Sequence, residues 1–194
     1  MPEGARRKVP VIEVDGGERV LDSTHILGYL EETFPDHLSL TPTDADERAK
    51  SDMIEEWVDD DLAYVLPAVI YGKWRDAVRA ARVVAKTSNF GPVQNAIVRA
   101  GGSLIMHQVA KRIVKKRGGG SPEAMLEAEM DKFEAWLGDR NFLCGSEPSI
   151  ADVASQGCLT CVQDFPAFDA AVMQRPRVAA WYNRVQKLRD DNRA

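Results

Sequence analysis

The stretch KVPVIEVDGGERVLDSTHILGYLEE, residues 8–32, contains two strand-like segments followed by a helix-like one. Residues 9–14 are rich in β-branched side chains, and residues 18–21 are long enough to form a partner strand. The DGG segment at 15–17 lies between them and is a turn signal. From Ser23 onward the apolar residues recur at helical spacing. The stretch therefore predicts a β-hairpin that runs directly into an amphipathic helix.

The segment after this helix predicts a division of the chain into two parts. Pro35 ends the helical pattern, and residues 35–44, PDHLSLTPTD, have no hydrophobic period and contain two prolines. We interpret this segment as a linker, with one domain over residues 1–38 and a second over residues 39–194. The expected fold class is mainly α, with a β-β-α unit followed by an all-helical bundle.

Cap and breaker residues mark the first helix of the second domain. Thr43 or Asp44 is expected to cap a long helix that runs from about Ala45 past Tyr64. Pro67 lacks a backbone N–H group, so it should kink or interrupt this helix.

The later helices carry equally local signals. A segment that restarts near Pro92 ends in KRIVKKRGGG, where basic residues complement the helix dipole and glycines terminate the helix. Ser121 is the expected N-cap of the next helix, Ser149 opens another that has few polar residues, and Arg175 precedes the last. We expect the helix after Ser149 to be central and buried. Two apolar stripes are predicted, over Leu126, Met130, Phe133 and Leu137 and over Val178, Trp181, Val185 and Leu188.

Composition excludes several classes of protein. Of the 194 residues, 44% are hydrophobic and 28% are charged, which is typical of a soluble globular protein. The net charge of −5 argues against nucleic acid as a general partner. No apolar run is long enough for a membrane span, and no secretory signal is recognisable, so we expect no membrane partner. Three cysteines do not make a disulfide framework, and we expect a cytoplasmic location.

Two residue pairs in the opening stretch are candidates for ligand binding. A cis bond between Val9 and Pro10 would turn the backbone of Val9 outward, where an extended peptide could pair with it. The alternative is an ordinary trans proline at the start of a strand. Ser23 at a helix N-terminus could hold a carboxylate, and Asp22 could accept a hydrogen bond from an ammonium group. The alternative for this pair is simple helix capping.

In combination, these pairs carry a resemblance to a known family. The order V-P, strand, G-G turn, strand, D-S and amphipathic helix, followed by YLEETFP and an L-x-P-x-D linker, resembles the soluble glutathione S-transferases. The segments FLCGSEPSIADV and RPRVAAWYNRV resemble the family's buried central helix and its final helix. In the first of them, Ser149 and Asp152 match the capping box. The resemblance covers most of the chain and is thinnest between about 75 and 120.

The resemblance implies a partial thioredoxin-like unit and a binding site for glutathione, which would act as co-substrate. Val9 would pair with the cysteinyl part, Pro10 would be cis, and Asp22 and Ser23 would hold the γ-glutamyl head. Lys8, or Arg6 and Arg7 nearby, would meet the glycine carboxylate. The implied reaction is attack of the glutathione thiolate on a small apolar electrophile, and the implied assembly is a homodimer. A scaffold of the same fold without catalytic activity is the alternative.

The sequence departs from the family at its beginning. Only seven residues precede Lys8, whereas a β-α-β unit precedes the corresponding strand in the family. The catalytic Tyr, Ser or Cys of the family lies in that unit, so we assign no catalytic residue here. We expect a truncated sequence, a second chain that covers the strand edge, or a degenerate relative.

Other chemical motifs have structural explanations. Cys158 and Cys161 form a C-x-x-C pair, but they lie nine or more residues after the predicted helix start, away from the dipole that would activate a thiol. We expect buried structural thiols and keep a redox role as the alternative. The three histidines lack metal-ligand spacing, and Asp59-Asp60-Asp61 is expected to be a solvated face, so no metal is assigned. Four aromatic residues could line a pocket, a dimer contact or the core: Trp57, Tyr64, Tyr71 and Trp74.

Overall fold

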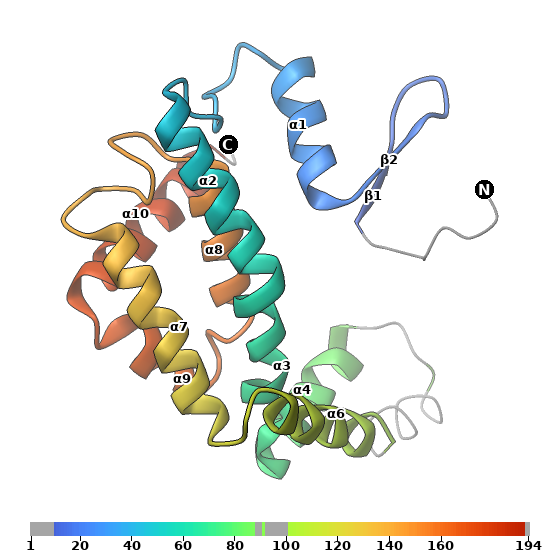
Figure 1. The fold of residues 1–194 in the computed structure, drawn as a ribbon. Helices are drawn as coiled ribbons and strands as arrows, with labels where there is room; N and C mark the ends of the chain where they lie inside the picture. Colours follow the sequence, from blue (N-terminus) through green and yellow to red (C-terminus); the bar gives the residue numbers. More distant parts are fainter. Residues whose placement is uncertain (1–9, 88–90, 92–100, 193–194) are drawn as a thin grey trace.

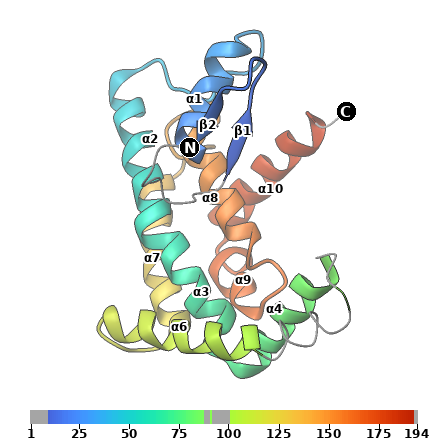
Figure 2. The same ribbon diagram turned by 90° about the vertical axis from the view of Figure 1, so that its right-hand side faces the viewer.

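The computed structural model describes residues 10–87, 91 and 101–192, and within them a small sheet precedes a series of helices (Figure 1). The elements are β1 (Val11–Glu13), β2 (Arg19–Leu21), α1 (Ser23–Thr33), α2 (Ala45–Trp57), the π-helical turn η1 (Val58–Leu62), α3 (Ala63–Gly72), α4 (Trp74–Thr87), α6 (Ser103–Lys116), α7 (Pro122–Leu137), α8 (Ile150–Thr160), α9 (Pro166–Phe168), the π-helical turn η3 (Asp169–Met173) and α10 (Pro176–Asp191). The hairpin and α1 lie at one end of the molecule, and α4 and α6 lie at the other (Figures 1 and 2). The mainly helical fold class is confirmed.

The predicted hairpin is confirmed. β1 and β2 pair antiparallel with Ile12 opposite Val20, and the ion pair between Arg19 and Glu13, 3.0 Å, bridges the strands. Gly16 and Gly17 have φ of 99° and 81°, a region that favours glycine because it has no Cβ. The DGG segment therefore provides the tight turn that the sequence predicts.

The long helix that follows the linker is broken differently from the prediction. Asp44 caps α2, and its carboxylate accepts hydrogen bonds from the N–H groups of Asp46 and Glu47 at 2.9 and 3.0 Å. Pro67, however, lies inside α3, and the helix continues through it. The α-helical hydrogen-bond pattern is interrupted upstream, over Val58–Leu62. Pro67 has no N–H group to donate to the carbonyl of Ala63, four positions earlier. Ala63 directly follows the π-helical turn, so the irregular hydrogen-bond pattern lies just ahead of this carbonyl.

The hydrophobic core is formed by the later helices together with α2 and α3. All four residues of the stripe predicted for α7 are buried, and Trp181 of α10 packs edge-on against Phe133, with ring centroids 4.6 Å apart. Trp57 also lies in the core, where its indole N–H donates to Glu129 at 2.7 Å. The stripe predicted for α10 is confirmed as well, with Leu188 at its edge.

The helix α8 is less buried than its sequence predicts. Ala151, Ser155 and Leu159 are fully buried, but Val153 is 38% exposed and Gly157 is exposed. Low polarity predicts burial on all sides, whereas α8 buries one face against α2 and α10 and leaves the other open. Its start is held by Asp152, which is fully buried and forms a capping box with Ser149.

The described helices include none that is both long and apolar enough to cross a membrane.

Candidate functional site

The two ends of the predicted glutathione site meet where the hairpin passes into α1. The N–H group of Asp22 donates to the carbonyl oxygen of Pro10 at 3.3 Å. Asp22 has φ 78° and ψ 136°, and it is the only described residue other than glycine with positive φ. Such a conformation costs roughly 1–3 kcal/mol and is concentrated at functional sites. Lys8 and Val9 lie outside the described residues.

The first turn of α1 is held by polar contacts. The carboxylate of Asp22 accepts from the N–H of Thr24 at 3.3 Å, so Asp22 is the N-cap, and Ser23 is the exposed first residue of the helix. The hydroxyl of Thr24 donates to Glu55 of α2 at 2.8 Å. The capping interpretation of Asp22 therefore agrees with the structure, and Glu55 is a neighbour that local sequence patterns could not reveal.

An acidic hollow of about 350 Å³ lies beside this turn. Thr24 forms one wall, and the carboxylates of α2 and η1 form the other: Asp52, Glu55, Glu56, Asp59 and Asp60. The volume is within the range of small-molecule sites. A wall of carboxylates favours an ammonium group and disfavours a second anion. The described residues include no group of three or more His, Cys, Asp or Glu that could hold a metal ion.

A second hollow follows the opposite end of α1. It has a volume of about 400 Å³ and forms what we term the apolar groove, lined by Leu27, Leu30, Glu31, Phe34, His37, Leu38, Leu40 and Ile150. Three of its side chains are 40–56% exposed: Leu30, Phe34 and Leu38. A contiguous exposed apolar surface of this kind is typical of binding sites.

Glu31 fixes the geometry of the apolar groove. Its carboxylate accepts from the N–H of Leu40 at 2.8 Å and from the hydroxyl of Ser39 at 2.7 Å. Burial raises the pKa of Glu31, but these hydrogen bonds outweigh burial and hold the pKa below its ordinary value. The carbonyl of Leu40 in turn accepts from the N–H of Ile150 at 3.0 Å. A chain of hydrogen bonds therefore joins α1 through the linker to α8.

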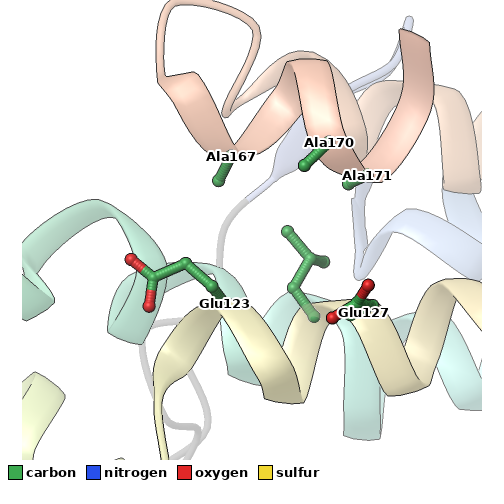
Figure 3. Close-up of a pocket in the computed structure, with 6 residues that line it drawn as sticks. Glu123, Glu127, Ala167, Ala170 and Ala171 are labelled. Carbon is green, nitrogen blue, oxygen red and sulfur yellow. The ribbon is translucent and has the colours of Figure 1, made fainter. Parts of the chain in front are cut away.

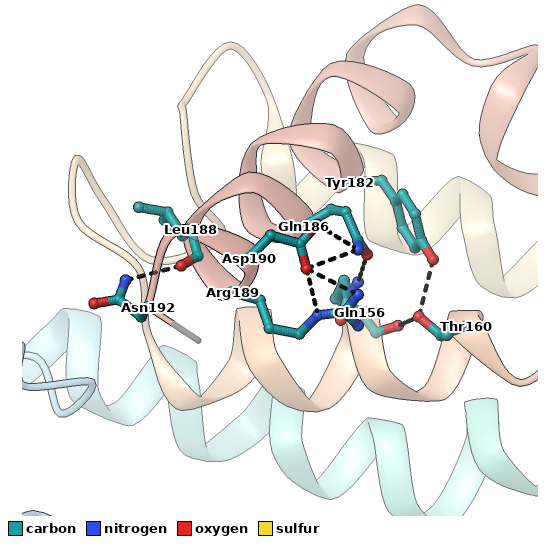
Figure 4. Close-up of polar contacts among 8 residues, drawn as sticks. All are labelled: Gln156, Thr160, Tyr182, Gln186, Leu188, Arg189, Asp190 and Asn192. Atoms are coloured by element: carbon teal, nitrogen blue, oxygen red, sulfur yellow. Dashed lines mark hydrogen bonds and ion pairs between the residues drawn. The ribbon is translucent and has the colours of Figure 1, made fainter. Parts of the chain in front are cut away.

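The groove continues toward α10 into a hollow of about 290 Å³, which shares His37, Leu38 and Leu40 with it. Polar contacts between α8 and α10 support this wall (Figure 4). The amide of Gln156 donates to Gln186 at 2.9 Å, and the hydroxyls of Thr160 and Tyr182 are 2.9 Å apart. These contacts join the two helices that form this wall of the hollow.

A fourth cavity is too small for a substrate. It lies between α7 and the α9–η3 segment, where Glu123 and Glu127 project from one side and three alanines face them (Figure 3). Its volume of about 80 Å³ is below the roughly 300 Å³ at which small-molecule sites begin.

The cysteine pair of α8 differs from the sequence-based expectation. Cys158 is half-buried, and Cys161 is exposed at the C-cap of the helix rather than buried. Burial, followed by the proximity of Cys161 and Asp59, raises the pKa of Cys158 to about 12. The prediction of two buried thiols is thus wrong for Cys161, because α8 ends at Thr160. A redox role is still disfavoured, since the negative end of the helix dipole opposes a thiolate.

Comparisons with known proteins agree with this architecture. Residues 123–188 match the family described as glutathione S-transferase, C-terminal domain. The resemblance to the glutathione S-transferases is therefore confirmed. A glutathione S-transferase from Rhodospirillum rubrum F11 has a similar structure, with a TM-score of 0.59, 19% identity, and coverage of 92% of this chain and 66% of that one. A glutathione S-transferase of Methylobacterium radiotolerans in complex with glutathione sulfonate has a TM-score of 0.51 and 23% identity, covering 92% and 68%.

A curated relative matches a large part of the chain in sequence. Prostaglandin E synthase 2 of Mus musculus is 25% identical over 139 residues. This match covers 68% of the present chain and 35% of the mouse protein. The chain thus spans about a third of the curated relative's length and about two thirds of the structural neighbours' length.

Proposed function

We propose that this glutathione S-transferase-like protein binds glutathione where β1, β2 and α1 meet. The observation that carries the proposal is the junction at Asp22, whose N–H contacts Pro10 and whose strained backbone opens α1. In this proposal the γ-glutamyl carboxylate lies at the helix N-terminus beside Ser23, and its ammonium group lies beside Asp22. The adjoining acidic hollow favours the same orientation of the ammonium group.

This placement of the γ-glutamyl head determines where the other parts of glutathione lie in the proposal. The cysteinyl part pairs with the backbone of Val9 ahead of Pro10, and Lys8 meets the glycine carboxylate. The complex of the Methylobacterium protein with glutathione sulfonate supports this ligand class. The proposed reaction is conjugation of the glutathione thiolate with a small apolar electrophile, with no residue of this chain assigned to thiol activation. The domains over 1–38 and 39–194, the homodimer and the cytoplasmic location belong to the same proposal.

Calorimetric titration with glutathione tests the binding site. Asp22→Asn keeps the N-cap and tolerates positive φ, but it removes the charge that an ammonium group would contact. We expect the dissociation constant to rise about tenfold or more, because a hydrogen bond to a charged group contributes roughly 1.5–3 kcal/mol.

The matched control is Asp44→Asn, since Asp44 is also an N-cap aspartate, at the start of α2. It should leave glutathione affinity unchanged. Equal effects of the two variants, or the absence of glutathione binding by the unaltered protein, would contradict the proposed site.

A second candidate function is that of a non-catalytic binding scaffold, and the apolar groove favours it. Its large side chains, 40–56% exposed, are ready to contact a partner molecule or a second copy. Light scattering on the unaltered chain and on Phe34→Ser tests this function. A complex that Phe34→Ser dissociates would support it, and a monomer at every concentration would argue against self-association.

A further inference from the structure

Charge is distributed very unevenly along the chain. Residues 73–117 contain eleven of the 25 lysines and arginines but only one of the 30 aspartates and glutamates, Asp76. This segment therefore has a formal charge of +10, whereas the remainder has −15. The described parts of the segment include α4 and α6, which lie at the opposite end of the molecule from the hairpin and α1 (Figures 1 and 2). The protein is thus strongly polarised, although its net charge is only −5.

The exposed face of α6 concentrates this positive charge. Ala110 and Ile113 are buried, and α6 packs mainly against α3. Lys111, Arg112 and Lys115 are exposed on the outward face, and they project within about one turn of each other. We define these three residues as the basic face.

The basic face has no counter-charge in the described part of the chain. Two other cations nearby are ion-paired, Lys73 with Glu123 at 2.6 Å and Arg117 with Asp61 at 2.7 Å, and Lys116 lies over the ring of Tyr64. No ion pair is found among the described residues for any member of the basic face. Three like charges on adjacent turns repel one another, so an external anion would relieve an existing repulsion.

Large apolar side chains adjoin the basic face. Leu104 and Ile105, about two to three turns earlier in α6, are 53% and 63% exposed. Trp74 at the start of α4 is 51% exposed, and its ring lies edge-on to His107 of α6, with centroids 6.1 Å apart. The same end of the molecule therefore combines cations with an exposed tryptophan, leucine and isoleucine.

We propose that α4 and α6 bind peripherally to the surface of an anionic lipid bilayer. The lysines and arginine of the basic face contact the lipid head groups, while Trp74, Leu104 and Ile105 enter the boundary with the acyl chains. Nucleic acid also attracts a basic face, but a phosphodiester backbone offers nothing to exposed Leu104 and Ile105. The acidic remainder of the molecule is oriented away from the bilayer.

The proposed contact is peripheral and does not require a membrane-spanning helix. The described helices include none that could span a membrane. The proposal departs from the expectation that the protein has no membrane partner, because that expectation considered membrane spans and secretory signals but not the distribution of charge. It uses residues of α4 and α6, and none of them belongs to the proposed glutathione site where β1, β2 and α1 meet (Figure 1).

Vesicle flotation with the full chain tests the proposal. We expect binding to vesicles of equal parts phosphatidylserine and phosphatidylcholine, and no binding to phosphatidylcholine alone. Roughly 1 M salt should release the protein, because the Debye length falls to about 3 Å. The variant with Lys111→Gln, Arg112→Gln and Lys115→Gln should bind the anionic vesicles roughly a hundredfold more weakly. Each removed cation weakens the electrostatic attraction between the protein and the anionic surface.

The control variant carries the same loss of charge elsewhere: Arg48→Gln, Lys187→Gln and Arg189→Gln, all on exposed or half-buried side chains of α2 and α10. It should bind like the unaltered protein, and circular dichroism should show that both variants are folded. Trp74 is the most exposed of the four tryptophans, so vesicles with brominated acyl chains should quench fluorescence that Trp74→Phe removes. Equal binding to neutral vesicles, equal loss in the control, or binding to duplex DNA without binding to vesicles would overturn the proposal.

Discussion

The hairpin–α1 unit, residues 10–33, and the bundle of α7, α8 and α10 are held together in opposite ways. In the first, Ile26 is the only buried residue, and contacts to the rest of the molecule include the polar bonds of Thr24 and Glu31. In the bundle, Phe133 and Trp181 are completely buried within one continuous core. The candidate glutathione site therefore lies on the less densely packed region.

This difference indicates that the two regions need not lose their structure together. Segments with few buried apolar contacts open locally, at a free energy below that of global unfolding. Ligand-binding elements are commonly drawn from such segments, because binding requires some adjustment. The bundle then acts as the rigid support against which α1 is positioned.

The largest effect is expected in the bundle, from Asp152→Ala. This carboxylate is fully buried and accepts from the N–H of Leu143, from the indole of Trp181, and from both the N–H and the hydroxyl of Ser149. The substitution leaves these donors unsatisfied, so the free energy of unfolding should fall by about 4 kcal/mol in urea denaturation. Asp139→Ala, whose side chain is 98% exposed, should change it by less than about 0.5 kcal/mol. Similar values for both would contradict the assigned role.

A smaller and local effect is expected from Ile26→Ala. It removes the only buried side chain of the hairpin–α1 unit, at a cost of about 2 kcal/mol. Native-state hydrogen exchange should show loss of protection in α1 but not in α7. The companion variant Leu126→Ala, in the core, should instead lower protection in α7. If Ile26→Ala weakened α7 equally, the two regions would form one cooperative unit.

The next effect concerns Glu31 and depends on pH. Its pKa in the folded chain lies below the ordinary value of 4.5, so its stabilising contribution is present above about pH 4.5 and is lost as the pH falls through the folded pKa. Glu31→Gln should lower the free energy required for local opening of α1 by about 1 kcal/mol at neutral pH. It should also make the opening of α1 less sensitive to acid. Glu32→Gln, on an exposed neighbour, is the control. An unchanged pH profile for Glu31→Gln would exclude this role.

The smallest effect on stability is expected for the thiols of α8. Cys161 is exposed, whereas the pKa of Cys158 is raised to about 12. In the folded protein at neutral pH, Ellman's reagent should modify Cys161 much faster than Cys158, because the thiolate is the reactive form. Cys161→Ser should remove the fast phase without altering the urea midpoint. Rapid modification of both thiols would revive the redox alternative.

Sequence patterns predicted the features that depend on neighbours along the chain. The DGG turn, a cap at Thr43 or Asp44 and the buried stripe of α7 are examples, because a turn, a cap and one helix face each involve residues a few positions apart. The π-helical turn over Val58–Leu62 and the open face of α8 were not predictable in this way. They depend on what each helix packs against.

The sequence by itself determined the hairpin, the start of most helices and the resemblance to the glutathione S-transferases, because these are encoded in local spacing. Only the tertiary structure decided which partners complete the site and the core. Thr24 meets Glu55, and Asp152 meets Trp181, across 31 and 29 positions of the chain. Such contacts arise when whole helices pack against each other, and no local periodicity specifies them.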